Sequence, residues 1–116
     1  MEKILSRYSC IYDYNCSYWN ENPKLVVKYL KLMQDWFNKC YKTQGIVYLS
    51  EVYKALGIPR TDTGNIIGWS KEAEFDDGFV DFGIRDNIIR SFFNGTIDYM
   101  ILDFNVTNLS FKKIGL

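Results

Sequence analysis

The sequence contains no histidine among its 116 residues. Histidine is the usual base near neutral pH, a frequent metal ligand and a member of the common catalytic triads, so all three kinds of site are excluded in their usual form. The chemistries that remain use paired carboxylates, a metal ion held by carboxylates, or a cysteine nucleophile. A catalytic role would therefore have to rest on Asp, Glu or Cys.

Cysteine is scarce as well, with only Cys10, Cys16 and Cys40. An odd number of thiols argues against a disulfide scaffold, and without histidine there is no zinc site of mixed ligands. Cys40 falls on the apolar stripe of a predicted helix, as a small buried hydrophobe does. Cys10 and Cys16 could pair, but no secretory signal precedes them, so reduced thiols in a cytoplasm are the better expectation.

Long apolar runs are also missing. No segment approaches the ~18 to 20 apolar residues that a helix needs to cross a bilayer. The start of the chain, MEKILSRYSC, lacks the apolar region of a signal peptide. We therefore expect a soluble, intracellular protein with no membrane partner.

Aromatic side chains are abundant, with eight Phe, nine Tyr and three Trp. A chain of this length can build one core but hardly two, so a single domain over residues 1–116 is expected. Most of the aromatic residues are expected to fill that core. In so small a domain some must stay partly exposed, which is a property of surfaces that bind proteins.

The net formal charge is zero, but the charges are unevenly distributed. Residues 1–61 carry nine basic and five acidic side chains, a net charge of +4. Residues 62–103 carry three basic and nine acidic side chains, a net charge of −6. We expect faces of opposite charge, which can steer a charged partner without identifying it.

The N-terminal part is predicted as an aromatic-rich arm, residues 1–22, followed by a core helix, residues 23–42. Residues 7–19 alternate between aromatic and small polar types, as an edge strand or an arm laid across the body does. Asn22 can cap the helix and Pro23 fits its first turn. Apolar residues spaced by three and four positions form one helix face: Val26, Tyr29, Leu30, Met33, Trp36, Phe37, Cys40 and Tyr41. Lysines form the opposite face, which could contact phosphates or an acidic protein, or simply be solvated: Lys24, Lys28, Lys31, Lys39 and Lys42.

The rest of the chain, residues 46–116, is predicted to alternate short strands and short helices. Strands are predicted at residues 46–49, 66–70 and 79–84, and helices at 51–56 and 87–93, capped by Ser50 and Asp86, with a turn-rich loop at 60–65. The chain is predicted to end in a long hairpin of residues 96–106 and 109–114, turning at Thr107-Asn108. This order indicates an α+β fold: a mainly antiparallel sheet packed on one long N-terminal helix, with two short helices.

Acidic residues gather in the stretch EFDDGFVDF, residues 74–82. Asp76, Asp77 and Asp81 are its tight cluster, and two of them could hold a magnesium ion, although the spacing of a calcium loop is missing. The favoured interpretation is a turn, in which aspartates bond to nearby backbone and Gly78 adopts a positive φ.

A strand after that glycine would place Asp81 on the face opposite Val80 and Phe82. Carboxylates divided between a loop and a strand face are poorly placed to share one ion. A metal site is therefore expected only if the fold brings Asp98 or Asp103 alongside.

Several motifs follow one another in a familiar order: VYLSEVYKALGIPRT, GNIIGW, FVDFGI, FFNG and ILDFNV. Over about residues 47–114 this order resembles an uncharacterised family of small proteins from phages and prophages of Gram-positive bacteria. The family has Asp-Gly where this chain has Thr107-Asn108, which loosens the turn prediction. The resemblance implies a viral or prophage protein in the host cytoplasm. It implies no catalytic activity.

Two classes of function, and a third less favoured one, follow from these observations. The first is a non-enzymatic phage or prophage accessory protein that binds a host or viral protein, with a host defence system as a target, through an acidic surface that also carries aromatics. The residues predicted for this surface are Glu72, Glu74, Asp76, Asp77 and Asp81.

The second class is a carboxylate- or metal-dependent enzyme acting on nucleic acid or sugar, with the cluster at 76–81 near Asp103. The third is a virion or assembly component. Binding is favoured, so no catalytic residue, cofactor or metal ligand is predicted. Direct nucleic-acid binding is not favoured, because the aromatic arm has only Arg7 beside it to hold phosphate.

Overall fold

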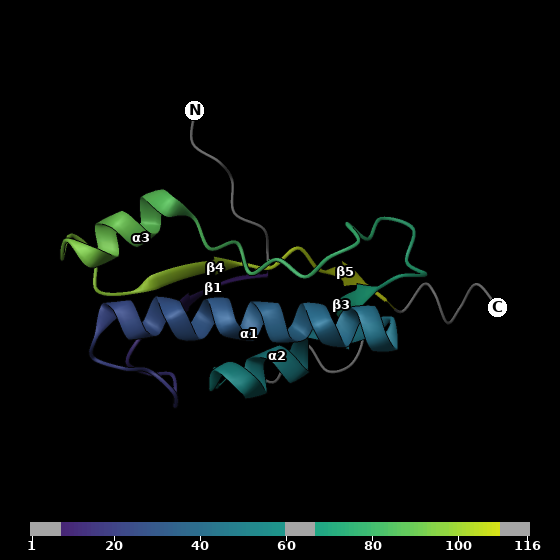
Figure 1. The fold of residues 1–116 in the computed structure, drawn as a ribbon, viewed down its shortest axis with the longest axis horizontal. Helices are drawn as coiled ribbons and strands as arrows, with labels where there is room; N and C mark the ends of the chain where they lie inside the picture. Colours follow the sequence, from purple (N-terminus) through teal and green to yellow (C-terminus); the bar gives the residue numbers. More distant parts are fainter. Residues whose placement is uncertain (1–7, 60–66, 110–116) are drawn as a thin grey trace.

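The computed structural model describes residues 8–59 and 67–109, which form an α+β fold with antiparallel sheets (Figure 1). Within these residues there are three helices and five strands. The helices are α1 (Pro23–Gln44), α2 (Leu49–Leu56) and α3 (Asp86–Phe93). The strands are β1 (Ser9–Tyr12), β2 (Ile46–Tyr48), β3 (Ile67–Ser70), β4 (Met100–Asp103) and β5 (Thr107–Asn108). The predicted fold class is confirmed at this level. The predicted loop at 60–65 lies outside the described residues.

Helix α1 begins where its capping residues predict. The Asn22 side chain accepts a hydrogen bond from the backbone N–H of Lys24 at 3.0 Å, and Pro23 occupies the first turn. Gly45 ends the helix in the left-handed conformation, with a φ of 80°, so the last helical residue is Gln44 rather than the predicted Lys42. Because β1 precedes it, α1 is not the first element of the fold.

One residue of the predicted apolar face of α1 is exposed, while the others are buried or partly buried. Trp36 remains 55% exposed, whereas its neighbour Phe37 is 6% exposed. Consecutive helical residues differ by about 100° around the axis, so only one of the two can face the strands. Apolar character in this helix therefore extends beyond the face that packs into the core.

The strands form two sheets rather than one. β1 pairs with β4, from Ser9 opposite Asp103 to Tyr12 opposite Met100. β2, β3 and β5 form the second sheet, in that order. The predicted strand in the N-terminal arm is confirmed as β1, which lies beside β4 in Figure 1.

The predicted C-terminal hairpin is wrong. Thr107 and Asn108 are not a turn but the strand β5, and they pair with Gly68 and Ile67 of β3. β4 takes β1 as its partner instead, which buries Tyr12 completely. Alternation of side chains predicts a strand but not its partner, and here distant segments supply both partners. The predicted second strand, 109–114, lies almost entirely outside the described residues.

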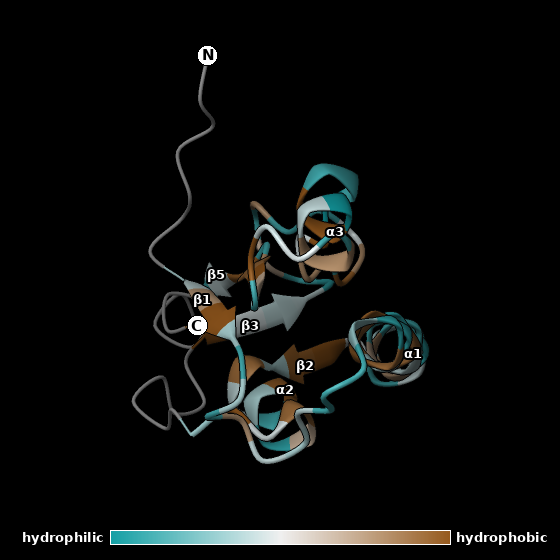
Figure 2. Ribbon diagram, turned by 90° about the vertical axis from the view of Figure 1, so that its left-hand side faces the viewer, coloured by the Kyte–Doolittle hydropathy of each residue, from teal (hydrophilic) through white to brown (hydrophobic). Residues whose placement is uncertain are grey.

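Aromatic rings make up the centre of the core, where Phe104 is surrounded by three others. Its ring centroid lies 5.4 Å from that of Phe82, 5.8 Å from that of Tyr53 and 6.4 Å from that of Trp69. All four side chains are at most 2% exposed. Such edge-to-face packing buries much apolar area. Figure 2 shows α1 at one edge of the molecule, with α3 above the strands and α2 below them.

The predicted strand at residues 79–84 is also wrong, because this segment is irregular. The carbonyl oxygen of Phe82 accepts from the N–H of Asp103 in β4 at 2.9 Å, but the N–H groups of the segment bond to side-chain amides. Asn38 accepts from the N–H of Val80 at 2.8 Å and donates to its carbonyl oxygen at 2.9 Å, and Gln34 accepts from the N–H of Phe82 at 2.7 Å. Buried backbone groups must be paired, and α1 pairs these.

No helix in the described ranges is both long enough and apolar enough to span a membrane.

The close approach of residue 83 to β4 gives the first prediction. Gly83 and Gly78 both have positive φ, 71° and 88°, but only at Gly83 would a Cβ lie 2.5 Å from the carbonyl oxygen of Asp103. Gly83→Ala should therefore lower the free energy of unfolding by roughly 1 to 3 kcal/mol more than Gly78→Ala, since both carry the same backbone strain. Urea unfolding of the two variants measures the difference. Equal losses would show that the irregular segment can move away from β4.

Candidate interaction site: the acidic loop

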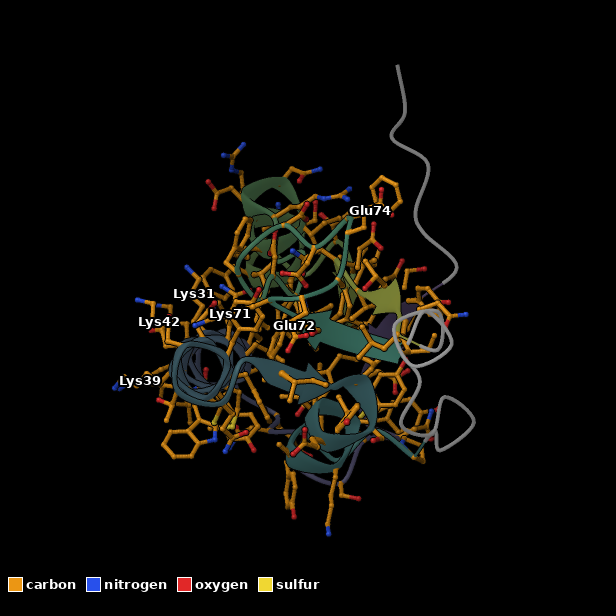
Figure 3. The ribbon with its side chains drawn as sticks, turned by 90° about the vertical axis from the view of Figure 1, so that its right-hand side faces the viewer. Lys31, Lys39, Lys42, Lys71, Glu72 and Glu74 are labelled. Carbon is orange, nitrogen blue, oxygen red and sulfur yellow. The ribbon has the colours of Figure 1, made fainter. Side chains whose placement is uncertain are left out.

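The candidate site is the loop between β3 and the irregular segment, residues 71–79, called here the acidic loop. It opens with turns in which the N–H of Ala73 donates to the carbonyl oxygen of Ser70 at 3.0 Å. Figure 3 shows Glu72 in front of the β3 end and Glu74 farther out on the loop. The loop also contains two of the predicted aspartates and two phenylalanines.

Asp76 holds the acidic loop together from within. Its Oδ1 accepts from the N–H of Ser70 at 3.0 Å, and its Oδ2 accepts from the N–H of Gly78 at 2.9 Å. Oδ2 also accepts a short hydrogen bond from the hydroxyl of Tyr41 on α1. The predicted turn, with an aspartate bonded to local backbone and a positive φ at Gly78, is confirmed. Asp76 thus supports the loop more than it contributes to its outer surface.

A second brace is the amide of Asn105, beyond β4. Its Oδ1 accepts from the indole N–H of Trp69 at 2.6 Å and from the N–H of Asp81 at 2.8 Å. Its Nδ2 donates to Asp77 at 2.9 Å and to the carbonyl oxygen of Phe79 at 3.1 Å. One side chain therefore joins the core to both sides of the turn.

The five predicted surface residues are placed differently from one another. Glu72, Glu74 and Asp77 are exposed, whereas Asp76 and Asp81 are half-buried. Asp81 accepts from the N–H of Gly83 at 2.8 Å. The outward residues are accompanied by aromatic ones that sequence reasoning did not assign to the surface: Phe75 is 80% exposed and Phe79 is 49% exposed.

The base of the acidic loop is tied to the end of α1. The Lys71 ammonium donates to the carbonyl oxygen of Lys42 at 3.0 Å, where the negative end of the helix dipole favours a cation. It also lies 5.6 Å from the centre of the Tyr41 ring. In Figure 3, Lys71 accordingly lies beside Lys42 and the end of α1.

The structure also shows where a carboxylate metal site would have to be. A polar hollow of about 440 Å³ is lined by Asp77, Asp81, Arg85, Asp103 and Asn105, among others. Arg85 bonds to Asp103 at 3.4 Å and so supplies a positive charge within it. Among the described residues no group of three or more acidic or thiol side chains is placed to hold a metal ion. Asp98 lines a different hollow, beside Trp19 and Phe92.

The fold and this loop define a small α+β protein with an acidic, aromatic loop on a braced base. The chain belongs to DUF6353, a family of unknown function, whose model matches residues 2–112. The match therefore includes the aromatic arm and α1 as well as the later elements. Comparisons with curated proteins and with solved structures give no match.

The bracing role of Asp76 gives the second prediction. Both of its oxygens face N–H donors, so Asp76→Asn places an amide N–H against a donor in either orientation. We expect the free energy of unfolding to fall by about 1 to 3 kcal/mol. Asp77→Asn is the matched control. Asp77 accepts its hydrogen bond from Asn105 with one oxygen, and the asparagine amide still has one oxygen to accept it, so the free energy of unfolding should change by no more than about 0.5 kcal/mol. Urea unfolding measures both, and similar losses for the two variants would contradict the assigned roles.

The third prediction concerns Tyr41 at high pH. Burial, with the hydrogen bond to Asp76 and its charge, raises the pKa of Tyr41 from 10.0 to about 12. An unfolded chain then loses this proton before the folded protein does. The stabilisation is complete below about pH 10 and is lost as the pH rises toward 12.

Tyr41→Phe removes this part of the pH dependence. The fall in unfolding free energy between about pH 9 and about pH 11.5 should be smaller in the variant than in the wild type. Because burial also raises the pKa of Tyr12 and Tyr29, a fall remains in both proteins. Identical slopes in urea unfolding experiments would disprove the contribution of Tyr41.

Proposed function

We propose that the protein is a non-enzymatic accessory protein of a phage or prophage that binds a host or viral protein through the acidic loop. The observation that carries the proposal is the combination of a braced loop base with an outward Phe75, 80% exposed between acidic neighbours. Large exposed aromatic side chains are typical anchors of protein interfaces.

The bracing of the loop supports binding energetically. Asp76 accepts from the backbone N–H groups of Ser70 and Gly78, and Asn105 donates to the carbonyl oxygen of Phe79. A surface held in shape before binding loses less conformational entropy on association than a loose one. The acidic loop can therefore bind a partner without the loop first having to become ordered.

The charge of the loop supports a basic partner surface. Glu72, Glu74 and Asp77 are exposed around Phe75, and carboxylates in such a position increase the rate of encounter with a positive surface. Proteins that act on nucleic acid have such surfaces in their grooves. We propose that the protein inhibits a host defence protein by occupying such a groove. The phage context of this proposal rests on the resemblance of residues 47–114 to the phage and prophage family.

The fourth prediction tests the acidic loop with a charge-matched control. The tagged protein is purified from an infected or lysogenic host, and the main partner is identified and then purified. Replacing Glu72 and Glu74 by Gln and Asp77 by Asn should weaken binding roughly tenfold at low salt and less at high salt, because exposed charges are screened. Phe75→Ala should weaken binding at both salt concentrations.

The control variant carries Glu21→Gln, Asp35→Asn and Asp98→Asn, which removes three exposed charges outside the loop. Its affinity should match that of the wild type. If both triple variants bind alike, or if the loop variant binds like the wild type, the acidic loop is not the interface.

A further inference from the structure

Helix α1 has a second apolar strip on the side that faces away from the core, called here the outer stripe. It consists of Leu25, Leu32 and Trp36, which are 46%, 53% and 55% exposed. Spacings of seven and four residues place the three side chains within about 40° of one another around the helix axis. A helix that packs one apolar face normally presents polar residues on the other, so the outer stripe calls for a separate explanation.

The outer stripe lies on the periphery of the molecule. The core-facing residues of α1, such as Val26, Leu30 and Phe37, are at most 6% exposed and lie about 100° to 140° around the helix axis from the middle of the stripe. Figure 1 shows α1 extending along the long axis of the molecule, and Figure 2 shows it at one outer edge. A flat surface could therefore approach the full length of the helix.

Lysines flank the outer stripe along one of its sides. Lys28 and Lys39 each lie three residues beyond a stripe residue, Leu25 and Trp36, and so are its direct neighbours. All five lysines of α1 are exposed, and Asp35 is the single acidic residue of the helix. In Figure 3, Lys31, Lys39 and Lys42 point from α1 away from the rest of the molecule.

We propose that the outer stripe and its lysines dock on an anionic lipid surface, with α1 lying in the plane of the headgroups. Leu and Trp side chains suit the boundary between headgroups and acyl chains, and lysines reach back to the phosphates. From Leu25 to Trp36 the stripe extends about 17 Å at 1.5 Å per residue. Such docking needs no membrane-spanning segment, so it revises the sequence-based expectation of no membrane partner.

The composition of this face favours lipid over protein as the occupant. Every basic residue of α1 is lysine and none is arginine. Protein interfaces are enriched in arginine and depleted in lysine, whereas a lysine ammonium is sufficient to attract anionic headgroups. A second copy of α1 in an antiparallel pair would bring the lysine flanks together, and their repulsion would oppose pairing.

The fifth prediction is tested with vesicles and the full chain. The protein is sedimented with vesicles of phosphatidylcholine alone, or of equal parts phosphatidylcholine and phosphatidylglycerol, at low salt. We expect roughly tenfold stronger partition to the anionic vesicles. Brominated acyl chains should quench the fluorescence of Trp36, and the Trp36→Phe variant should lose this quenching while it still binds.

Two double variants and their controls locate the contact. Lys28→Glu with Lys39→Glu should reduce partition at least roughly tenfold, whereas Lys54→Glu with Arg90→Glu, the same charge change outside α1, should reduce it less.

Likewise, Leu32→Ser with Trp36→Ser should reduce partition, and Phe75→Ser with Phe93→Ser, exposed apolar residues elsewhere, should not. Circular dichroism checks that each variant is folded. Absence of binding to anionic vesicles would overturn the proposal and favour an acidic protein surface as the occupant. Equal binding to both vesicle types, or α1 variants that bind like the wild type, would overturn it as well.

Discussion

The pairing of backbone groups in an irregular segment is the constraint on which the rest of this structure depends. Residues 79–84 enter the core with Val80 and Phe82, and β4 lies beside them, but no strand accepts the N–H groups of residues 80 to 82. Unpaired, those groups would cost several kcal/mol in a buried position. Asn38, Gln34 and Asn105 accept from these N–H groups instead, and in doing so they connect α1, the segment and the chain after β4. The far end of the acidic loop is held in this way through Asn105, and its β3 end is held by Asp76 and Lys71.

The positions of the helices were predictable because their signals are local. The predicted caps of the two short helices are wrong, because Ser50 lies inside α2 and Asp86 is the first residue of α3, whose N-caps are Tyr48 and Arg85. The cap at Asn22, the proline after it and the glycines at 45 and 57 act within a few residues of the helix ends that they determine. Strand positions followed in part from alternation, as for β1. Pairing did not, because the choice of partner depends on contacts between distant segments. The failed prediction at Thr107-Asn108 is of this kind: a polar dipeptide at the right place for a turn instead lies beside β3.

The position of the candidate site in the chain was predictable, but the contacts that each of its residues makes were not. Turn chemistry located the loop around Gly78, and alternation correctly turned Asp81 away from Val80 and Phe82 even though no strand forms there. The contacts of Asn105 with the loop, and the bond from Tyr41 to Asp76, could not be predicted, since they join residues more than twenty positions apart. One signal was available: Gln34 and Asn38 lie on the same side of α1 as Val27 and Tyr41, and the latter two are buried. Amides on a buried arc must find hydrogen-bond partners, so they mark the place where an irregular segment can enter.

The pairing of β1 with β4 has a consequence for how the molecule forms. Tyr12, fully buried here, pairs with Met100, so nearly all of the intervening chain must be synthesised before this contact is possible. Closing so long a loop comes at an entropic disadvantage that local contacts in the helices do not have. The helices can therefore form early, whereas the aromatic N-terminal strand stays without its sheet partner until late. During that interval its apolar side chains are open to other chains, and the time spent in that state sets how readily the protein aggregates during synthesis.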